Sequence, residues 1–434
     1  MLLKDKIDAQ LPAWRDRVKT LVKESGAVKV GEVNIAQIYG GMRDVKGLVT
    51  DISYVDPTEG IRMRGFPIPE LLVKLPKALG GEMPLVGGLY YLLLIGEFPS
   101  LEEASYVEDE WKRRSEVPGY VFDMLRAMHP DTHPMTMFSA AVLAMQKESL
   151  YASNYHKLRK DEYWIDTLED SLNLTARIPA IAAFIYRRKY KKSQEIQPDL
   201  ALDWAGNFAN LMGVPGSGYA DLSRLYFIIH ADHESGNVSA HATHLVGSAL
   251  SDVYYATSAG LNGLAGPLHG LANQECLGWL LDVYEQFGGV PTADQLRTFA
   301  WDTLNAGHVI PGYGHAVLRK TDPRFTAQMD FAKTHLPDDD IFKLASLVYD
   351  VVPKVLIEQG KAKDPWPNVD AISGTLQQHY GVKEFDFYTV LFGVSRLLGV
   401  SANLVWSRAL SQPIERPKSL TTAMLEEIAL KAKG

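Results

Sequence analysis

The sequence predicts an all-α protein with one small β-hairpin. Apolar residues recur at spacings of three and four along most of the chain, which is the period of an amphipathic helix. The alternation typical of a strand is confined to 51–54 and 61–64, on either side of the turn sequence Asp-Pro-Thr-Glu-Gly at 56–60. At 434 residues the chain is long enough for two or three domains and an ample core.

Four helices can be placed from their patterns, in chain order. The segment 101–117 is charged and predicts a surface helix, and 222–229 repeats apolar residues at helical spacing. A third helix is expected to begin at Pro267, a preferred first residue, and to run past Leu280 to the glycines at 288–289. The segment 387–410 is apolar all round with small residues interspersed, which indicates a helix buried among others or at a subunit interface.

Composition limits the classes of function. The net charge of -8 and the pI of about 5.9 argue against a nucleic-acid-binding surface. The single cysteine, Cys276, excludes an internal disulfide, fits a reducing compartment and lies at the spacing of a buried core thiol. No apolar run approaches the roughly 20 residues that span a bilayer. Because the N-terminus resembles neither a signal nor a transit peptide, we expect a cytoplasmic protein or a processed organellar form.

Histidines gather in one part of the chain, since seven of the twelve fall between His230 and His315. Imidazole is the side chain that most often moves protons or binds metals near neutral pH. These histidines lie among glycines and prolines that interrupt helices, in the segments 230–237, 266–270 and 311–315. The pattern indicates an enzyme whose reactive side chains face a cleft.

Three residues are candidates for the chemistry, each with a structural alternative. His269 would lie in the first turn of its helix, where the dipole disfavours the imidazolium, so a neutral ring could donate an N–H to a carbonyl oxygen; alternatively it caps or packs. His315 follows glycines that let a ligand approach the backbone, or it is a surface loop residue. Asp370 follows a stiff loop at 359–368 and is either a general base or a helix N-cap.

Several cations could bind an anionic substrate. Arg396 lies in an apolar run, so its guanidinium must snorkel, form an ion pair or bind an anion. Arg324 and Arg416 lie beside proline turns, and each would be an ordinary surface residue if judged alone. The same holds for the pair Lys361 and Lys363.

A metal site is the alternative from another class of function. The paired spacing of His230, His233, His241 and His244 would suit zinc, as in a metal-dependent hydrolase. However, the chain has no His-Glu-x-x-His motif and no cysteine ligands for it, so we expect no metal.

Five motifs in a fixed order resemble the citrate synthase family, of the long type found in mitochondria and some bacteria. They are Tyr-Gly-Gly-Met-Arg at 39–43, His-Ala-Asp-His-Glu at 230–234, Gly-Pro-Leu-His-Gly at 266–270, Pro-Gly-Tyr-Gly-His at 311–315 and Asn-Val-Asp at 368–370, with Glu-Arg-Pro-Lys-Ser at 415–419 as a further match. The resemblance covers essentially the whole chain. It implies an all-α homodimer with a large domain of residues 1–270 and 382–434, a small domain of residues 271–381, and the active site between them.

The resemblance also implies a reaction and a set of site residues. The family joins the methyl carbon of acetyl-CoA to the ketone carbon of oxaloacetate and then hydrolyses the citryl thioester to citrate and CoA. By resemblance, Asp370 removes the methyl proton, His269 stabilises the enolate oxygen and His315 protonates or polarises the ketone oxygen. Oxaloacetate would be bound by His233, Arg324, Arg396 and Arg416, the last contributed by the other subunit. CoA would be bound by Arg43, Arg159, Val309, Ile310, Gly312, Arg319, Lys361, Ala362, Lys363 and Asn368.

The resemblance implies no metal or prosthetic group, and neither nucleic acid nor a membrane as a partner. It makes the mitochondrial matrix the alternative location if the chain is a processed form. Acyl specificity stays open, because 2-methylcitrate synthase uses the same machinery with propionyl-CoA. One methylene group in an apolar pocket changes specificity only about 10–200-fold.

Overall fold

The computed structural model describes residues 2–191, 195–214, 216–315 and 317–433. In this part of the chain the protein is helical apart from one small sheet, which confirms the predicted fold class. The helices up to the histidine-rich region are α1 (Leu2–Ser25), α2 (Ile35–Tyr39), α3 (Ile68–Lys74), α4 (Val86–Ile95), α5 (Leu101–Arg114), α6 (Gly119–Ala127), α7 (Pro134–Ala144), η1 (Met145–Glu148), α8 (Leu150–Asn154), η2 (Lys160–Glu162), α9 (Tyr163–Tyr186), η3 (Arg187–Lys191), α10 (Trp204–Met212) and α11 (Ser217–Ile229). The later helices are α12 (Val238–Ser248), α13 (Val253–Leu264), α14 (Pro267–Gly270), α15 (Ala272–Phe287), α16 (Ala293–Asn305), α17 (Pro323–His335), α18 (Asp340–Gln359), α19 (Asp370–His379), α20 (Phe385–Ala409) and α21 (Thr422–Lys431).

The predicted hairpin is present and has one additional strand. Strands β1 (Ser53–Asp56) and β2 (Gly60–Met63) pair antiparallel around a turn in which the Asp56 carboxylate accepts the N–H groups of Thr58 and Glu59. Strand β3 (Phe66–Pro67) adds to β2. Two residues are too few to show an alternation, so the sequence pattern could not reveal β3.

Helix α20 is the core of the larger part of the molecule. It packs against α4, α7, α9, α11, α12 and α13, and small residues allow the close approach. A Cβ on Gly393, for example, would lie 2.8 Å from Leu261 Cδ2. Among the described residues α20 alone is long and apolar enough to cross a membrane, but 94% of its most apolar window is buried in the protein. The expectation that no segment reaches this length is therefore wrong: Arg396 interrupts the apolar run without making the helix polar.

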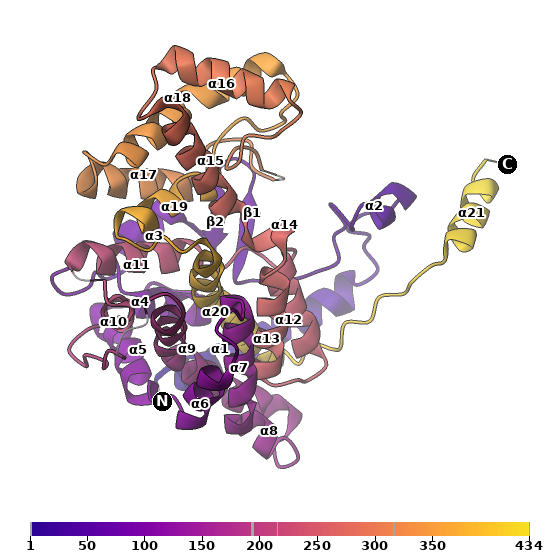
Figure 1. The fold of residues 1–434 in the computed structure, drawn as a ribbon. Helices are drawn as coiled ribbons and strands as arrows, with labels where there is room; N and C mark the ends of the chain where they lie inside the picture. Colours follow the sequence, from indigo (N-terminus) through magenta and orange to yellow (C-terminus); the bar gives the residue numbers. More distant parts are fainter. Residues whose placement is uncertain (1, 192–194, 215, 316, 434) are drawn as a thin grey trace.

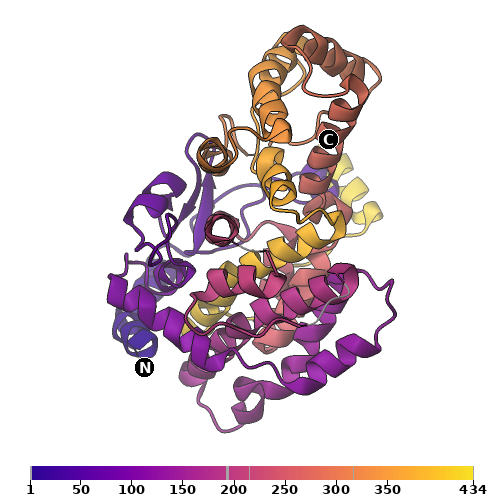
Figure 2. The ribbon, with the colours of Figure 1, turned by 60° about the vertical axis from the view of Figure 1, so that its left-hand side comes forward.

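The later helices gather into a separate group. Figure 1 shows α15, α16, α17 and α18 at the top, above the remaining helices, and Figure 2 shows the same group from another side. Within the group, α15 packs against α18 and α19, and α16 packs against α18. The helix predicted to start at Pro267 is broken, because Leu271 separates the four-residue α14 from α15. The domain boundaries at 270/271 and 381/382 stay a prediction.

Two short helices project from the body. In Figure 1, α2 and α21 lie outside the helical body and are joined to it by extended segments. The Tyr39 hydroxyl lies 2.8 Å from Thr422 Oγ1, which joins the two projections. Helix α2 has no buried residue and α21 has one, Leu425, so little of either helix packs against its own chain.

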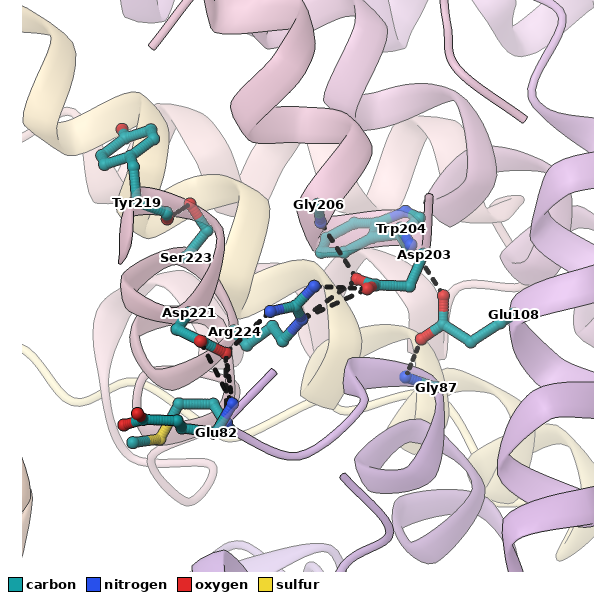
Figure 3. Close-up of polar contacts among 11 residues, drawn as sticks. Glu82, Gly87, Glu108, Asp203, Trp204, Gly206, Tyr219, Asp221, Ser223 and Arg224 are labelled. Atoms are coloured by element: carbon teal, nitrogen blue, oxygen red, sulfur yellow. Dashed lines mark hydrogen bonds and ion pairs between the residues drawn. The ribbon is translucent and has the colours of Figure 1, made fainter. Parts of the chain in front are cut away.

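A buried polar network lies among α4, α5, α10 and α11 (Figure 3). The Glu108 carboxylate accepts backbone N–H groups at the starts of α4 and α10, at 2.7 and 2.8 Å. Arg224 of α11 forms ion pairs with Asp203 and Asp221, and Asp221 also accepts two backbone N–H groups of the segment before α4. Because α11 ends directly before the 230–234 segment, this network fixes the helix that presents the first histidines of the cleft.

Candidate active site

Two of the loops that carry candidate site residues pair with each other. Gly314 N–H donates to Trp366 O at 3.0 Å, and Asn368 N–H donates to Gly312 O at 2.9 Å. The Asn368 side chain adds a bond to Gly314 O at 3.1 Å. The glycine-rich loop and the stiff loop predicted from the sequence are therefore neighbours, and they end at His315 and Asp370.

Gly312 can occupy this position only because it has no side chain. Its φ of +80° is in the left-handed region that favours glycine. A Cβ there would lie 2.8 Å from Cys276 Sγ and 2.9 Å from Ala371 Cα. The close approach holds the loop against the start of α19 and the buried thiol of α15.

Asp370 is the first residue of α19. The N-cap residue is Val369, so the interpretation of Asp370 as a helix cap is wrong. The Asp370 N–H donates to Asn368 Oδ1 at 3.0 Å, which fixes the backbone. Burial raises the pKa of the carboxyl group to about 6, against the smaller opposing effect of the Arg324 guanidinium. The carboxylate is thus ionised at neutral pH and more basic than an ordinary aspartate.

His315 is held as a neutral proton donor. Its Nδ1 accepts the N–H groups of Val317 and Leu318, both at 3.0 Å, so its proton resides on Nε2. Burial lowers the pKa of the ring to about 4, and Arg324 lowers it further. The centroid of the His315 ring lies 5.7 Å from that of the His233 ring, so the two imidazoles are neighbours.

His269 is also neutral, with its proton on the other nitrogen. Its Nε2 lies 3.3 Å from Ser239 N, and an amide N–H can only donate, so the proton of the imidazole is on Nδ1. The pKa of the ring is lowered to about 4 by burial and by Arg396. The neutral state expected from the sequence is found, but its expected cause is wrong, because α14 has only four residues and can supply little dipole.

Two buried guanidinium groups lie among these side chains. Arg324, 4% exposed, pairs through Nε and Nη2 with Asp322, so the expectation of an ordinary surface arginine is wrong. Arg396, 3% exposed, donates through Nη1 to Asn237 Oδ1 at 2.9 Å and to Ser239 Oγ at 3.0 Å. Burial lowers the pKa of His233, and Arg324 and Arg396 lower it further, so His233 stands within the field of both cations.

Sequence reasoning missed Ser239 and Asn237. They connect His269 to Arg396: Ser239 Oγ lies 2.9 Å from His269 Nε2, and it donates to Asn237 Oδ1 at 2.7 Å. The available signal was an Asn-Val-Ser segment that begins three residues after the end of the His-Ala-Asp-His-Glu motif, at the start of a helix. Asn237 is indeed the N-cap of α12.

The residues expected on the CoA side mostly lie in or next to the paired loops. Val309 is 80% exposed, Ile310 is buried, and Lys361, Ala362 and Lys363 are exposed in the stiff loop. Arg319 donates its backbone N–H to Pro57 O at 2.8 Å. These positions flank the paired loops, together with Gly312 and Asn368.

Three expected site residues are not brought to the cleft of their own chain. Arg416 is exposed in the extended segment that leads from α20 to α21, and Arg43 is exposed in the segment after α2. Arg159 is exposed between α8 and α9 and pairs with Asp161 and Glu162.

The four histidines of the metal hypothesis do not converge. His230 Nδ1 lies 2.9 Å from Tyr226 O, and its ring stacks on Tyr226. His241 pairs instead with Glu415 of the C-terminal segment. Across residues 2–191, 195–214, 216–315 and 317–433, no group of three or more His, Cys, Asp or Glu side chains is arranged to hold a metal ion. The geometry therefore gives no support to a metal-dependent hydrolase.

The fold and the cleft define a class of protein: a helical enzyme that combines a basic carboxylate, two neutral imidazoles of opposite tautomer and two buried guanidinium groups. The family model described as "Citrate synthase, C-terminal domain" matches residues 41–418. The chain is 52% identical to mitochondrial citrate synthase of Xiphias gladius, over 97% of this chain and 90% of that protein. It is also 52% identical to a probable mitochondrial citrate synthase of Glossina morsitans morsitans, over 99% of this chain and 93% of that protein.

Solved structures of citrate synthases share the fold of this chain. Citrate synthase of Pyrobaculum aerophilum superposes with a TM-score of 0.77 at 26% identity, covering 91% of this chain and 95% of that one. The fold is shared with the Thermoplasma acidophilum enzyme, solved with carboxymethyl coenzyme A and oxaloacetate, at a TM-score of 0.73 and 22% identity over 90% of this chain and 97% of that one. The chain belongs to the citrate synthase family, whose members are acyltransferases.

The comparisons correct the expected location. Relatives at 51–52% identity are named mitochondrial, which contradicts the expectation of a cytoplasmic protein. The expectation rested on the N-terminal sequence, and the fold itself carries no mark of a compartment, because targeting signals are read by receptors and are separate from the fold.

Proposed function

We propose that the chain condenses acetyl-CoA with oxaloacetate and water, releasing citrate and CoA. The observation that carries the proposal is the combination of Asp370, His269 and His315. One is a carboxylate with a raised pKa, and the other two are neutral imidazoles whose protons are on different nitrogens. The names of the relatives support a mitochondrial enzyme of the tricarboxylic acid cycle.

The first step is removal of a methyl proton from acetyl-CoA. Asp370 Oδ takes the proton, and burial is the main cause of its raised basicity. Negative charge develops on the thioester oxygen, which His269 Nδ1–H stabilises as a donor. A fixed donor of this kind is worth roughly 3–4 kcal/mol in the transition state. A neutral donor suits the step, because an imidazolium would protonate Asp370 or the enolate outright.

The second step is attack of the enolate carbon on the ketone carbon of oxaloacetate. His315 Nε2–H donates to the ketone oxygen as it gains charge. Arg324 and Arg396, with His233, bind the two carboxylates of oxaloacetate and orient the ketone. Water then hydrolyses the citryl thioester, releasing the CoA thiol.

Side chains supply each proton transfer, so the proposal includes no metal or prosthetic group. Activity should then persist in a chelating agent after exhaustive dialysis. The relatives described above are named citrate synthases, and no observation favours propionyl-CoA.

The proposal retains a small domain of residues 271–381 that closes on the large domain. His315, Arg324 and Asp370 come from the former, and His233, His269 and Arg396 from the latter. Both sets must contact one small dianion. Closure would also exclude water from the enolate.

A homodimer explains the projecting helices and Arg416. Apolar residues are exposed along α2, α21 and the adjoining segments: Val30, Val33, Ile38, Tyr39, Met42, Ile414, Leu420, Met424, Ile428 and Leu430. An exposed apolar surface of this kind marks a site of protein–protein contact. In a homodimer, α2 and α21 of one chain would pack against the second copy. Arg416, which is exposed in its own chain, would then reach the oxaloacetate site of the other subunit.

Subunit mixing tests this arrangement. Arg416→Ala and Asp370→Asn proteins are each expected to be nearly inactive. A mixed dimer should regain one intact site, because both defects then fall in the same cleft and the other cleft has neither. Activity should rise toward about a quarter of wild type if exchange is statistical. Mixed dimers that are shown by mass spectrometry and remain inactive would disprove the cross-subunit role.

Asp370→Asn alone tests the catalytic assignment. A positioned base contributes roughly 10²–10⁴-fold, so turnover should fall by that factor while the Kd for oxaloacetate is unchanged. In the presence of a non-reacting oxaloacetate analogue, the exchange of acetyl-CoA methyl protons with solvent should also be lost in this variant. Near-normal turnover with a lowered Tm would leave Asp370 as a purely structural residue.

A further inference from the structure

The β1–β2 hairpin contacts two of the loops that carry candidate site residues, and the chemistry described above does not use it. Its strands are bound to the loop that carries His233, and its turn is bound to the loop that carries Arg319 and leads to Arg324. Figure 1 shows β1 and β2 between the upper helices and the body. Two sets of contacts therefore meet in one short, rigid element.

On the large-domain side, Ser53 is the central contact. The residue is buried, with 3% of its surface exposed. Its hydroxyl donates to Asp232 Oδ2 at 2.6 Å and accepts the Glu234 N–H at 2.8 Å. The Glu234 carboxylate in turn accepts the Val55 N–H at 3.2 Å. The residues before and after His233 are thus both fixed to β1.

The conformation that these bonds hold is a strained one. Glu234 has a φ of +46°, in the left-handed region that non-glycine residues rarely adopt. Such a residue persists only when the surrounding contacts enforce it. Ser53 and Val55 supply contacts of this kind from β1. The Asn237 side chain supplies others from the start of α12, by donating to His233 O and Glu234 O. The direction in which His233 points therefore depends in part on β1.

On the small-domain side, the turn of the hairpin makes the contact. Pro57 O accepts the Arg319 N–H at 2.8 Å. Gly60 lies so close to Pro323 that a Cβ would be 2.4 Å from Pro323 Cδ. Asp56 makes the turn rigid, because its Oδ1 accepts three hydrogen bonds from Thr58 and Glu59. Its Oδ2 accepts a fourth from the Tyr54 hydroxyl on the strand.

We propose that the hairpin is a positioning element that couples the two substrate sites: Ser53 orients His233 for oxaloacetate, and contact of the turn with 319–323 transmits that order to the CoA side. The inference rests on the proposed function and names the residues through which oxaloacetate prepares the site for acetyl-CoA. Ser53 and Gly60 are positioning residues, and neither touches a reacting atom.

The first experiment replaces Ser53. In Ser53→Ala the Glu234 N–H and the Asp232 carboxylate lose their partner, so the Kd for oxaloacetate should rise about 5–30-fold, with kcat at saturation within about 3-fold of wild type. Tyr54→Phe is the matched control, because it removes a hydroxyl from the same strand that contacts only Asp56. Equal oxaloacetate Kd values in Ser53→Ala and wild type would overturn the positioning role.

The second experiment tests the coupling through the turn. Binding of carboxymethyl coenzyme A, a non-reacting analogue of acetyl-CoA, is measured by calorimetry with and without oxaloacetate. Oxaloacetate should tighten it at least about 10-fold in the wild type, and Gly60→Ala should lose most of that gain because its Cβ displaces Pro323. Gly65→Ala is the matched control: its φ of +89° imposes the same backbone strain, but its Cβ would meet nothing within 4 Å.

The outcomes separate this inference from the proposed function. The coupling would be overturned if Gly60→Ala and Gly65→Ala lost the oxaloacetate-dependent gain in affinity for carboxymethyl coenzyme A to a similar extent. It would also be overturned if oxaloacetate did not raise that affinity in the wild type. Citrate formation could still proceed in either case. Failure of the wild type to form citrate would instead overturn the proposed function. Since Ser53→Ala and Gly60→Ala could both destabilise the fold, each is assayed below its Tm, and the changed ligand-dependent ratio is the readout that destabilisation alone would not produce.

Discussion

Lowering the pH should inactivate the enzyme through a single carboxyl group, Asp370. Burial raises the pKa of this group to about 6 in the free protein. The pKa values of His269 and His315 are lowered to about 4, and that of His233 is also lowered, so these rings stay neutral over the same range. Among the three proposed catalytic residues, Asp370 is therefore the one expected to titrate between about pH 5 and pH 7.

The magnitude follows from that pKa. With a value of about 6, roughly 90% of Asp370 is ionised at pH 7, half at pH 6 and roughly 10% at pH 5. The kcat/KM for acetyl-CoA at saturating oxaloacetate should fall tenfold per unit below the pKa, with unit slope. Bound oxaloacetate brings negative charge, which would move the midpoint to about 6 or above.

The assay follows loss of thioester absorbance across this range in buffers of constant ionic strength. Acid unfolding is a separate cause of lost activity, so full recovery on return to neutral pH is the control. A rate that is flat from about pH 7.5 to pH 5 in folded protein would refute the assignment of Asp370 as the base. A slope of two would show that a second group also titrates.

Three further predictions concern other described residues. Ser239→Ala should lower kcat about 10-fold, because His269 and Arg396 lose a shared partner; wild-type kcat in a folded variant would contradict this link. Cys276 is buried and burial raises its pKa, so iodoacetamide should modify it only in urea, as followed by mass spectrometry; rapid labelling of native protein would contradict the buried thiol. Burial raises the pKa of Asp170 to about 7, so its folded form holds a proton that the unfolded chain releases near pH 4. The free energy of unfolding should therefore fall as pH rises from about 4 to 7, by up to about 4 kcal/mol, and Asp170→Asn should remove that fall in urea titrations; parallel pH profiles would contradict it.

Much of the fold could be predicted because local pattern decides it. The stripe ending at 288 gave α15, and the apolar segment 387–410 gave α20, each within two residues at its C-terminal end. The break at Leu271 and the two-residue β3 could not be predicted, since tertiary contacts rather than periodicity determine them.

The site was predictable where reactive residues lie in unusual local sequence. His315 and Asp370 follow glycine and proline loops that differ from ordinary helix, so they stand out. Ser239 lies in the first turn of α12. The Asn-Val-Ser segment indicates the helix start but not that the hydroxyl will meet His269 and Arg396. The burial of Arg324 could not be predicted from the sequence either, because it depends on the residues that the fold places around it.

The contact between α20 and the His233 loop has a consequence for how this chain tolerates mutation. A Cβ on Gly399 would lie 2.4 Å from Asp232 Cβ and 2.7 Å from Ala231 O, so any side chain there must displace the loop. In a saturation library selected for growth, Gly399 should be depleted as strongly as the residues that touch substrate. Depletion in such a library would not distinguish Gly399, which only leaves room for the loop, from a residue that transfers a proton. Measuring whether substrate binding or turnover is lost would distinguish them.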